Sequence, residues 1–404
     1  PWPQTIALGA QHVVAMFGAT VLAPLLMGFD PNVAVLMSGV GTLIFFAATG
    51  GKVPSYLGSS FAFISVVIAA TAYAGQGLNA NIGLALGGIV ICSALYAVIG
   101  LVVMSVGTRW VERLMPPVVT GAVVAVIGLN LASIPIKNMA PTGFDAWMQA
   151  VTFVSIGVVA VFTTGMTRRL LILVGLIAAC LAYAALTNGL GWGKPIAGGL
   201  IADAAWFGMP NFTAPVFEVR AIVLIAPVAL ILVAENLGHL KAVGAMTGQD
   251  MDRHIGRAFL GDGVATMVSG GVGGTGVTTY AENIGVMSAT RIYSTALFVV
   301  AALFAIVLGF SPKFGAVIHT IPLAVMGGIS IVVFGLIAIA GARIWVDNRV
   351  DFTDSRNLIV AAITLVLGTG DFTLKFGDFA MGGIGTATFG AIILNAVLSR
   401  GRGR

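Results

Sequence analysis

The feature that most constrains this chain is a run of apolar residues, long enough to cross a lipid bilayer, that recurs along its whole length. A helical membrane span needs about 20 predominantly apolar residues, and such stretches return throughout the 404 residues. Only 9% of the residues are charged, whereas a soluble domain carries roughly 25%. The mean hydropathy of +1.03 agrees with this. The sequence therefore predicts an integral membrane protein and excludes a cytosolic enzyme.

The apolar runs are continuous, which predicts helices. Transmembrane strands would alternate between apolar and polar residues, whereas a helix satisfies its backbone hydrogen bonds within one continuous run. Glycine, proline and charged residues divide the runs into fourteen spans, with ends accurate to about 2–4 residues. The expected fold is an all-α membrane protein with spans at 4–26, 32–49, 56–74, 82–105, 117–135, 148–165, 169–187, 219–240, 257–270, 276–289, 292–310, 318–341, 356–370 and 380–399.

The distribution of basic residues predicts the orientation of these spans. With the N-terminus in the cytoplasm, fifteen of the 20 Lys and Arg residues fall on the cytoplasmic side. Such an excess is the usual mark of cytoplasmic loops. The fourteen spans then place both termini in the cytoplasm. Because no basic run exceeds Arg168-Arg169, orientation explains the net charge of +5 better than binding to nucleic acid does.

Two interruptions of the apolar runs resemble each other. Residues 58–63 in the third span and 277–282 in the tenth both read as two hydroxyl residues, an aromatic residue and alanine. A second pair of spans, near Pro117 and Pro322, shares a glycine spacing of seven. These pairs divide the chain into two seven-span halves, and an odd number per half predicts an inverted repeat with a binding site at the broken spans. Alternatively, the small residues only allow close helix packing.

Few ionisable side chains fall inside the predicted spans, and these are candidates for function because charge is costly in lipid. Glu235 and His239 are four residues apart and share a helix face, so they can relay a proton, although a static hydrogen bond is the alternative. The role of Asp262 is left open between function and tight packing, because glycines flank it. The complete set is His12, Glu235, His239, Asp262 and Glu282.

Glu282 begins the half-span that follows the second interruption. Its carboxylate is expected near the positive end of that short helix, with the ring of Tyr280 beside it and the ring of Phe61 supplied by the other half. Two carboxylates, aromatic faces and unpaired backbone groups suit a planar ligand with ring N–H donors and carbonyl acceptors. They do not suit an anion.

Other motifs carry little weight. Residues 271–276 match the glycine pattern of a dinucleotide-binding loop, but no strand-helix unit with a downstream acidic residue surrounds them. The two cysteines, Cys92 and Cys180, lie in apolar runs and cannot form a disulfide framework or a four-ligand metal site. No cofactor or metal is expected.

Several long motifs resemble the nucleobase-ascorbate, or nucleobase-cation symporter-2, family. They are 11–12, 58–63, 234–239 and 282–291, and the similarity extends over essentially the whole chain. Within the family the sequence looks most like the bacterial uracil permeases, and stretches such as 107–110 and 340–346 are similar to the branch associated with pyrimidine utilisation.

The resemblance implies a core domain, from residues 1–115 and 191–317, and a gate domain, from 116–190 and 318–404. Short antiparallel strands would interrupt spans 3 and 10. Glu235 and Glu282 would bind the pyrimidine, with backbone help from Phe61 and Ala281, while Tyr280 would line the site and His239 would take part in proton coupling. Phe334 stands where uracil permeases of the family carry tyrosine, whereas Ser330, one turn earlier, remains.

The expected function is proton-coupled import of uracil, and of related pyrimidines, across a bacterial inner membrane. The proton is the coupling ion, and the family implies pairing of two copies through the gate domain. A transporter for xanthine or urate on the same scaffold is one alternative, and a sulfate or bicarbonate carrier is disfavoured by Glu282. An intramembrane enzyme that uses Glu235 and His239 for acid-base chemistry is the alternative of another class.

Overall fold

Helices account for most of the chain in the computed structural model, which describes residues 2–73, 77–196, 198–376 and 379–400. Within these described residues, four short strands interrupt the helices. The helices longer than ten residues are α1 (Trp2–Met27), α2 (Pro31–Ala48), α4 (Ile82–Val106), α6 (Pro117–Leu131), α8 (Gly143–Phe162), α10 (Leu171–Ala184), α13 (Val228–Thr247), α14 (Ile255–Val272), α16 (Ala296–Gly309), α18 (Leu323–Asp347), α19 (Ser355–Thr369) and α20 (Gly383–Arg400).

Shorter elements connect or break the long helices. The strands are β1 (Leu57–Ser59), β2 (Val277–Thr279), β3 (Leu374–Phe376) and β4 (Phe379–Met381). The short helices are η1 (Phe61–Phe63), α3 (Ile64–Thr71), α5 (Arg109–Leu114), α7 (Ser133–Asn138), α9 (Gly165–Arg169), η2 (Ala185–Gly189), α11 (Gly199–Asp203), α12 (Val219–Ile225), η3 (Asp252–His254), α15 (Ala281–Thr290) and α17 (Pro312–His319).

Several helical segments have the length and composition of membrane spans. In the part of the chain that the structure describes, eight such segments are long and apolar enough to cross a bilayer, and a ninth is added if α16 and α17, bent by 82°, form one span. Shorter apolar helices include Ser355–Thr369 and Gly383–Ser399. The protein is therefore a multi-pass membrane protein, and the number fourteen stays a prediction.

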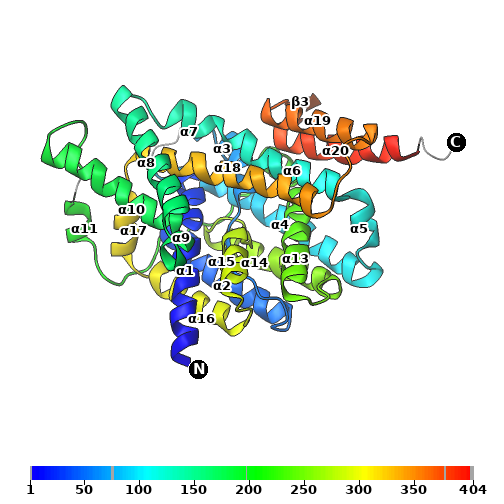
Figure 1. Cartoon of the computed structure of the whole chain (residues 1–404), viewed down its shortest axis with the longest axis horizontal. Coiled ribbons are helices and arrows are strands. Elements are labelled where there is room, and N and C mark those ends of the chain that lie inside the picture. Colours follow the sequence, from blue (N-terminus) through cyan, green and yellow to red (C-terminus); the bar gives the residue numbers. More distant parts are fainter. Residues whose placement is uncertain (1, 74–76, 197, 377–378, 401–404) are drawn as a thin grey trace.

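The helices pack in two groups. In the first, α14 lies against α4 and α2, and α16 lies against α1 and α2. In the second, α18 packs on α6 and α8, while α19 packs on α20 and α6. Figure 1 shows α18 crossing above α14 and α15, with α19 and α20 beside each other near the C-terminus. Each group combines an early and a late part of the sequence.

Strands β1 and β2, whose central residues Gly58 and Thr278 are 220 positions apart in the sequence, form an antiparallel pair inside the first group. Gly58 pairs with Thr278, and the flanking residues follow in register. The other edges of the two strands are satisfied by buried hydroxyls. Thr42 Oγ1 accepts the Leu57 N–H at 2.9 Å, and Thr266 Oγ1 accepts the Val277 N–H at 3.1 Å. Such partners are required because backbone groups unpaired in hydrocarbon cost several kcal/mol.

Gly58 is required where the two strands meet α1. A Cβ at this position would lie 2.5 Å from the Tyr280 ring and 2.7 Å from Thr20 Oγ1. The Tyr280 hydroxyl donates to the Ser59 carbonyl at 2.8 Å. The small residue in the first interruption therefore makes room for the aromatic residue of the second.

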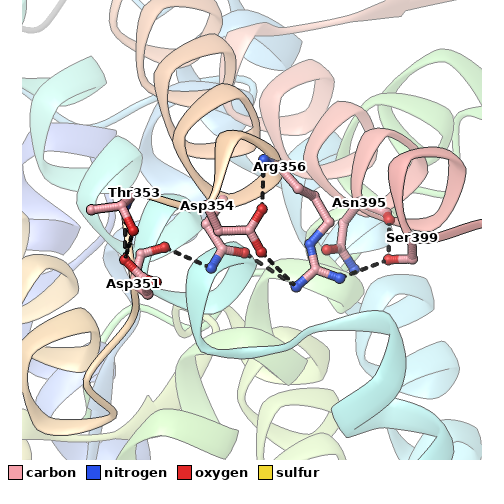
Figure 2. Close-up of polar contacts among 7 residues, drawn as sticks. Asp351, Thr353, Asp354, Arg356, Asn395 and Ser399 are labelled. Atoms are coloured by element: carbon pink, nitrogen blue, oxygen red, sulfur yellow. Dashed lines mark hydrogen bonds and ion pairs between the residues drawn. The ribbon is translucent and has the colours of Figure 1, made fainter. Parts of the chain in front are cut away.

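A polar cluster joins the connection after α18 to the C-terminal helix α20 (Figure 2). Asp351 accepts the N–H and the hydroxyl of Thr353 at 2.8 and 2.7 Å. These two bonds, the hydroxyl first, lower the pKa of the Asp351 carboxyl. Asp354 caps α19 by accepting the Arg356 N–H, and Arg356 Nη1 donates to Ser399 Oγ at 3.3 Å. The cluster fixes the end of α20 to the start of α19.

Candidate transport site

Glu282 lies in the first turn of α15, where the helix begins directly after strand β2. The N–H groups of a helix N-terminus favour a carboxylate. Glu282 also lines a cavity of about 470 Å³, which is within the range of small-ligand sites. Residues from α1, α9, α10, α15 and α18 surround this cavity, and Arg168 is among them. The cavity thus lies where α1 of the first packing group approaches α18 of the second.

Glu235 lies in the middle of α13, which packs against α15, the helix that carries Glu282. The negative charge of Glu282 acts on the Glu235 carboxylate, and the Ser60 side chain also interacts with it. Its Oε2 atom is buried and has no hydrogen-bond partner among the described residues. Glu235 is not part of the lining of the Glu282 cavity. A buried carboxylate oxygen without a donor can accept a proton or an N–H of a ligand.

His239 lies one turn after Glu235 and contacts strand β2. Its Nδ1 atom is 2.9 Å from Thr279 Oγ1. The Thr279 hydroxyl has one hydrogen, which it uses to donate a hydrogen bond to Asn236 Oδ1. In the second hydrogen bond the protonated Nδ1 of His239 is therefore the donor and Thr279 Oγ1 is the acceptor. The neutral imidazole then keeps Nε2 as a proton acceptor.

Asn236 connects this chain of hydrogen bonds to Asp262. Its amide nitrogen donates to Asp262 Oδ2 and to the Tyr96 hydroxyl, the latter at 2.8 Å. Its oxygen also accepts the Thr278 hydroxyl at 2.8 Å. Asp262 is buried on α14, and its second oxygen has no partner among the described residues. Asp262 therefore belongs to a network that positions His239 and does not merely fill space between glycines.

The remaining residues predicted to bind substrate lie at separate positions in the structure. Phe61 on η1 and Phe334 on α18 meet edge to face, with ring centroids 6.0 Å apart, and so they link the two packing groups. Tyr280 is buried against Ser59 through its hydroxyl. Ser330 is buried and donates to the Met326 carbonyl one turn earlier, while Ala281 is exposed at the start of α15. None of these five residues is part of the lining of the Glu282 cavity.

His12 lies apart from the Glu235 network. It is buried on α1, where its ring packs against Phe298 at a centroid distance of 4.8 Å. Asn283 Nδ2 lies 3.1 Å from His12 Nδ1 and donates to the His12 carbonyl at 3.2 Å. Because Asn283 follows Glu282 directly, His12 holds the start of α15 against α1.

Sequence reasoning overlooked the residues that connect these groups. Asn236, Thr278 and Thr279 were parts of motifs and were not assigned roles, although an amide inside an apolar helix is itself a signal of a buried polar network. Within the described residues, no group of three or more His, Cys, Asp or Glu side chains could hold a metal ion.

A family model described as the permease family matches residues 3–376. The chain belongs to this permease family. It is 67% identical over 400 residues to RutG of Escherichia coli (strain K12), whose name describes a candidate pyrimidine permease, with 99% of this chain and 90% of that protein covered. It is 41% identical over 411 residues to the uracil permease of Bacillus caldolyticus, covering 98% and 92%.

Solved structures show the same fold at low sequence identity. The transmembrane domain of a cyanobacterial bicarbonate transporter, BicA, matches with a TM-score of 0.65 at 16% identity, covering 90% of this chain and 95% of that domain. The murine anion transporter Slc26a9 matches with a TM-score of 0.67 at 11% identity, covering 98% and 68%. Membership of a permease family confirms the prediction of a transporter and removes the enzyme alternative.

Proposed function

We propose that this permease imports uracil, and related pyrimidines, together with protons. The observation that carries the proposal is the proximity of Glu235 and Glu282 at the break between β2 and α15. Paired carboxylate oxygens accept the ring N–H groups of a pyrimidine, and backbone groups near Phe61 and Ala281 serve its carbonyl oxygens. The relatives named as pyrimidine and uracil permeases support this cargo.

Proton coupling follows from the neighbouring imidazole. His239 keeps a proton acceptor at Nε2 and is held by Thr279. A proton taken up from outside would either neutralise Glu235 or Glu282 or turn His239 into a cation, and each of these changes lowers the electrostatic cost of holding the two carboxylates together when substrate binds. One charge crossing the membrane gains about 2.3 kcal/mol per 100 mV, enough for more than a tenfold gradient of substrate, since each 1.4 kcal/mol corresponds to about tenfold.

The proposal includes the finer architecture. We propose fourteen spans in two inverted seven-span repeats, with β1 and β2 at the broken spans 3 and 10. The first packing group would be the core and the second the gate, and transport would occur as one moves against the other around Phe61 and Phe334. Both termini would lie in the cytoplasm, in a bacterial inner membrane, with two copies paired through the gate.

Uptake of labelled uracil into proteoliposomes tests this function. Glu235→Gln and Glu282→Gln should each lower uptake at least tenfold, whereas Glu218→Gln, an exposed glutamate before α12 without a capping hydrogen bond, should leave it unchanged. Undiminished uptake by both site variants would contradict the proposal.

Competition by unlabelled compounds separates the rival cargoes. Uracil should compete fully, and thymine partly, because both bases carry the ring N–H groups that the proposed carboxylate pair would accept. Stronger competition by xanthine or urate would favour the purine alternative, and competition by bicarbonate or sulfate alone would favour an anion carrier.

A further inference from the structure

A second cavity, of about 650 Å³, lies away from the Glu282 cavity. Three connections that are distant in sequence meet there, namely the one after α2, the one after α13 and the one between α15 and α16. Its size is typical of a small-molecule site. The cavity is lined by Gly51, Lys52, Pro54, Thr247, Gln249, Arg253, His254, Tyr293, Ser294 and Thr295.

The charged side chains of this lining are all basic. Lys52 and Arg253 are exposed, and among the described residues neither forms an ion pair or a side-chain hydrogen bond. The acidic residue next to Arg253 is already engaged, because Asp252 pairs with Lys241 at 2.6 Å. The positively charged side chains of Lys52 and Arg253 thus both line this cavity, and neither is paired with a carboxylate among the described residues.

The pKa of His254 indicates that the cavity is positively charged. Its pKa is lowered, first by burial and then by the positive charges of Arg253, Arg257 and Lys52, which outnumber the one acidic neighbour, Asp250. Ser294 and Thr295, which precede helix α16, also line this cavity. Thr295 is the N-cap residue of α16, and its side chain makes no capping hydrogen bond. The positive end of a 14-residue helix and two hydroxyl donors therefore add to the basic side chains.

We propose that this cavity binds a phosphate group carried by a small molecule or by a lipid headgroup, held by Lys52, Arg253 and the hydroxyls of Ser294 and Thr295. Phosphate oxygens accept several charge-assisted hydrogen bonds at once, and Arg and Lys are the side chains that usually supply them. A neutral ligand would leave both cations unpaired.

Each wall of the cavity continues into an element of the transport site. Thr247 ends α13, which carries Glu235 and His239. Pro54 precedes β1, and Tyr293 closely follows α15, which carries Glu282. In the proposed orientation this face lies in the cytoplasm, so a cytoplasmic phosphate ligand would contact the same three segments that hold the imported base. This last step rests on the proposed function, whereas phosphate binding itself does not.

Binding to the purified full-length protein tests the proposal. The probes are inorganic phosphate, uridine monophosphate and vesicles of phosphatidylglycerol. Uridine, which lacks the phosphate, is the control for uridine monophosphate. Vesicles of phosphatidylcholine, which has no net negative charge, are the control for phosphatidylglycerol. The test variant is a double substitution, Lys52→Ala together with Arg253→Ala. The control variant is Arg109→Ala, because Arg109 is an exposed arginine outside the cavity. Thermal unfolding verifies that each variant is folded.

We expect saturable binding of at least one phosphate probe, weakened about tenfold or more in the double variant because charge-assisted hydrogen bonds are lost, and unchanged in Arg109→Ala. A response confined to phosphatidylglycerol identifies a lipid headgroup as the source, and a response to uridine monophosphate but not to uridine identifies a soluble phosphate. If the double variant binds all three probes as the parent protein does, or if the parent binds none, the proposal is wrong. Neither result depends on uracil uptake.

Discussion

His239 on α13 and Thr279 on strand β2 are joined by a hydrogen bond of 2.9 Å between Nδ1 and Oγ1. The Thr279 hydroxyl donates its own hydrogen bond to Asn236 Oδ1, so one threonine fixes both the tautomer of the histidine and the position of the amide. Strand β2 thus holds the His239 ring in place as well as pairing with β1.

Replacing Thr279 tests this relationship. Thr279→Val keeps the β-branched shape but removes both hydrogen bonds, and we expect uracil uptake to fall about tenfold, in line with the loss of one to two buried hydrogen bonds. Thr279→Ser keeps the hydroxyl and should retain most of the activity. Equal uptake by the two variants would show that the hydroxyl does not position His239.

Gly58 leads to a prediction about stability. Gly58→Ala would press a methyl group against Tyr280 and Thr20, and such overpacking typically costs about 1–3 kcal/mol. The matched control is Gly157→Ala on α8, where an added Cβ meets nothing within 4 Å. Thermal unfolding should show a lower melting temperature for Gly58→Ala only. A similar value for both variants would argue against close packing at the strand pair.

The contact between Phe61 and Phe334 predicts an energetic coupling between the two packing groups. Edge-to-face aromatic pairs contribute about 0.5–1.5 kcal/mol beyond their buried area. A double-mutant cycle with Phe61→Leu and Phe334→Leu, read out as the apparent affinity for uracil, should give a coupling in that range. Strict additivity of the two substitutions would show that the rings do not act together.

Asp351 predicts a pH dependence outside the membrane spans. Its native pKa is lowered by the two Thr353 hydrogen bonds, so the stabilisation is present at neutral pH and is lost as the pH falls through the native pKa. Asp351→Asn should melt at a lower temperature than the parent protein at neutral pH. The difference between the two should shrink in acid. A difference that grows in acid would have the wrong sign for this mechanism.

The sequence predicted the class of the fold and the local breaks better than the contacts across the protein. Apolar runs indicate membrane helices directly, and residues 57–59 and 277–279, where the strands lie, fall in or next to the two interruptions identified from hydroxyl and glycine residues. The network of Asn236, Asp262 and Tyr96 was not predicted, because its members come from three helices whose packing no periodicity reveals. The basic cavity could not be predicted for the same reason, since Lys52, Arg253 and Tyr293 are far apart from one another in the sequence.

The most direct test of the account is uracil accumulation in proteoliposomes under an imposed inward proton gradient. We expect the parent protein to accumulate uracil against its gradient and a protonophore to abolish this accumulation. We expect accumulation to be lost in Glu282→Gln but not in Glu218→Gln. Accumulation that is insensitive to the protonophore, or that persists in Glu282→Gln, would contradict it.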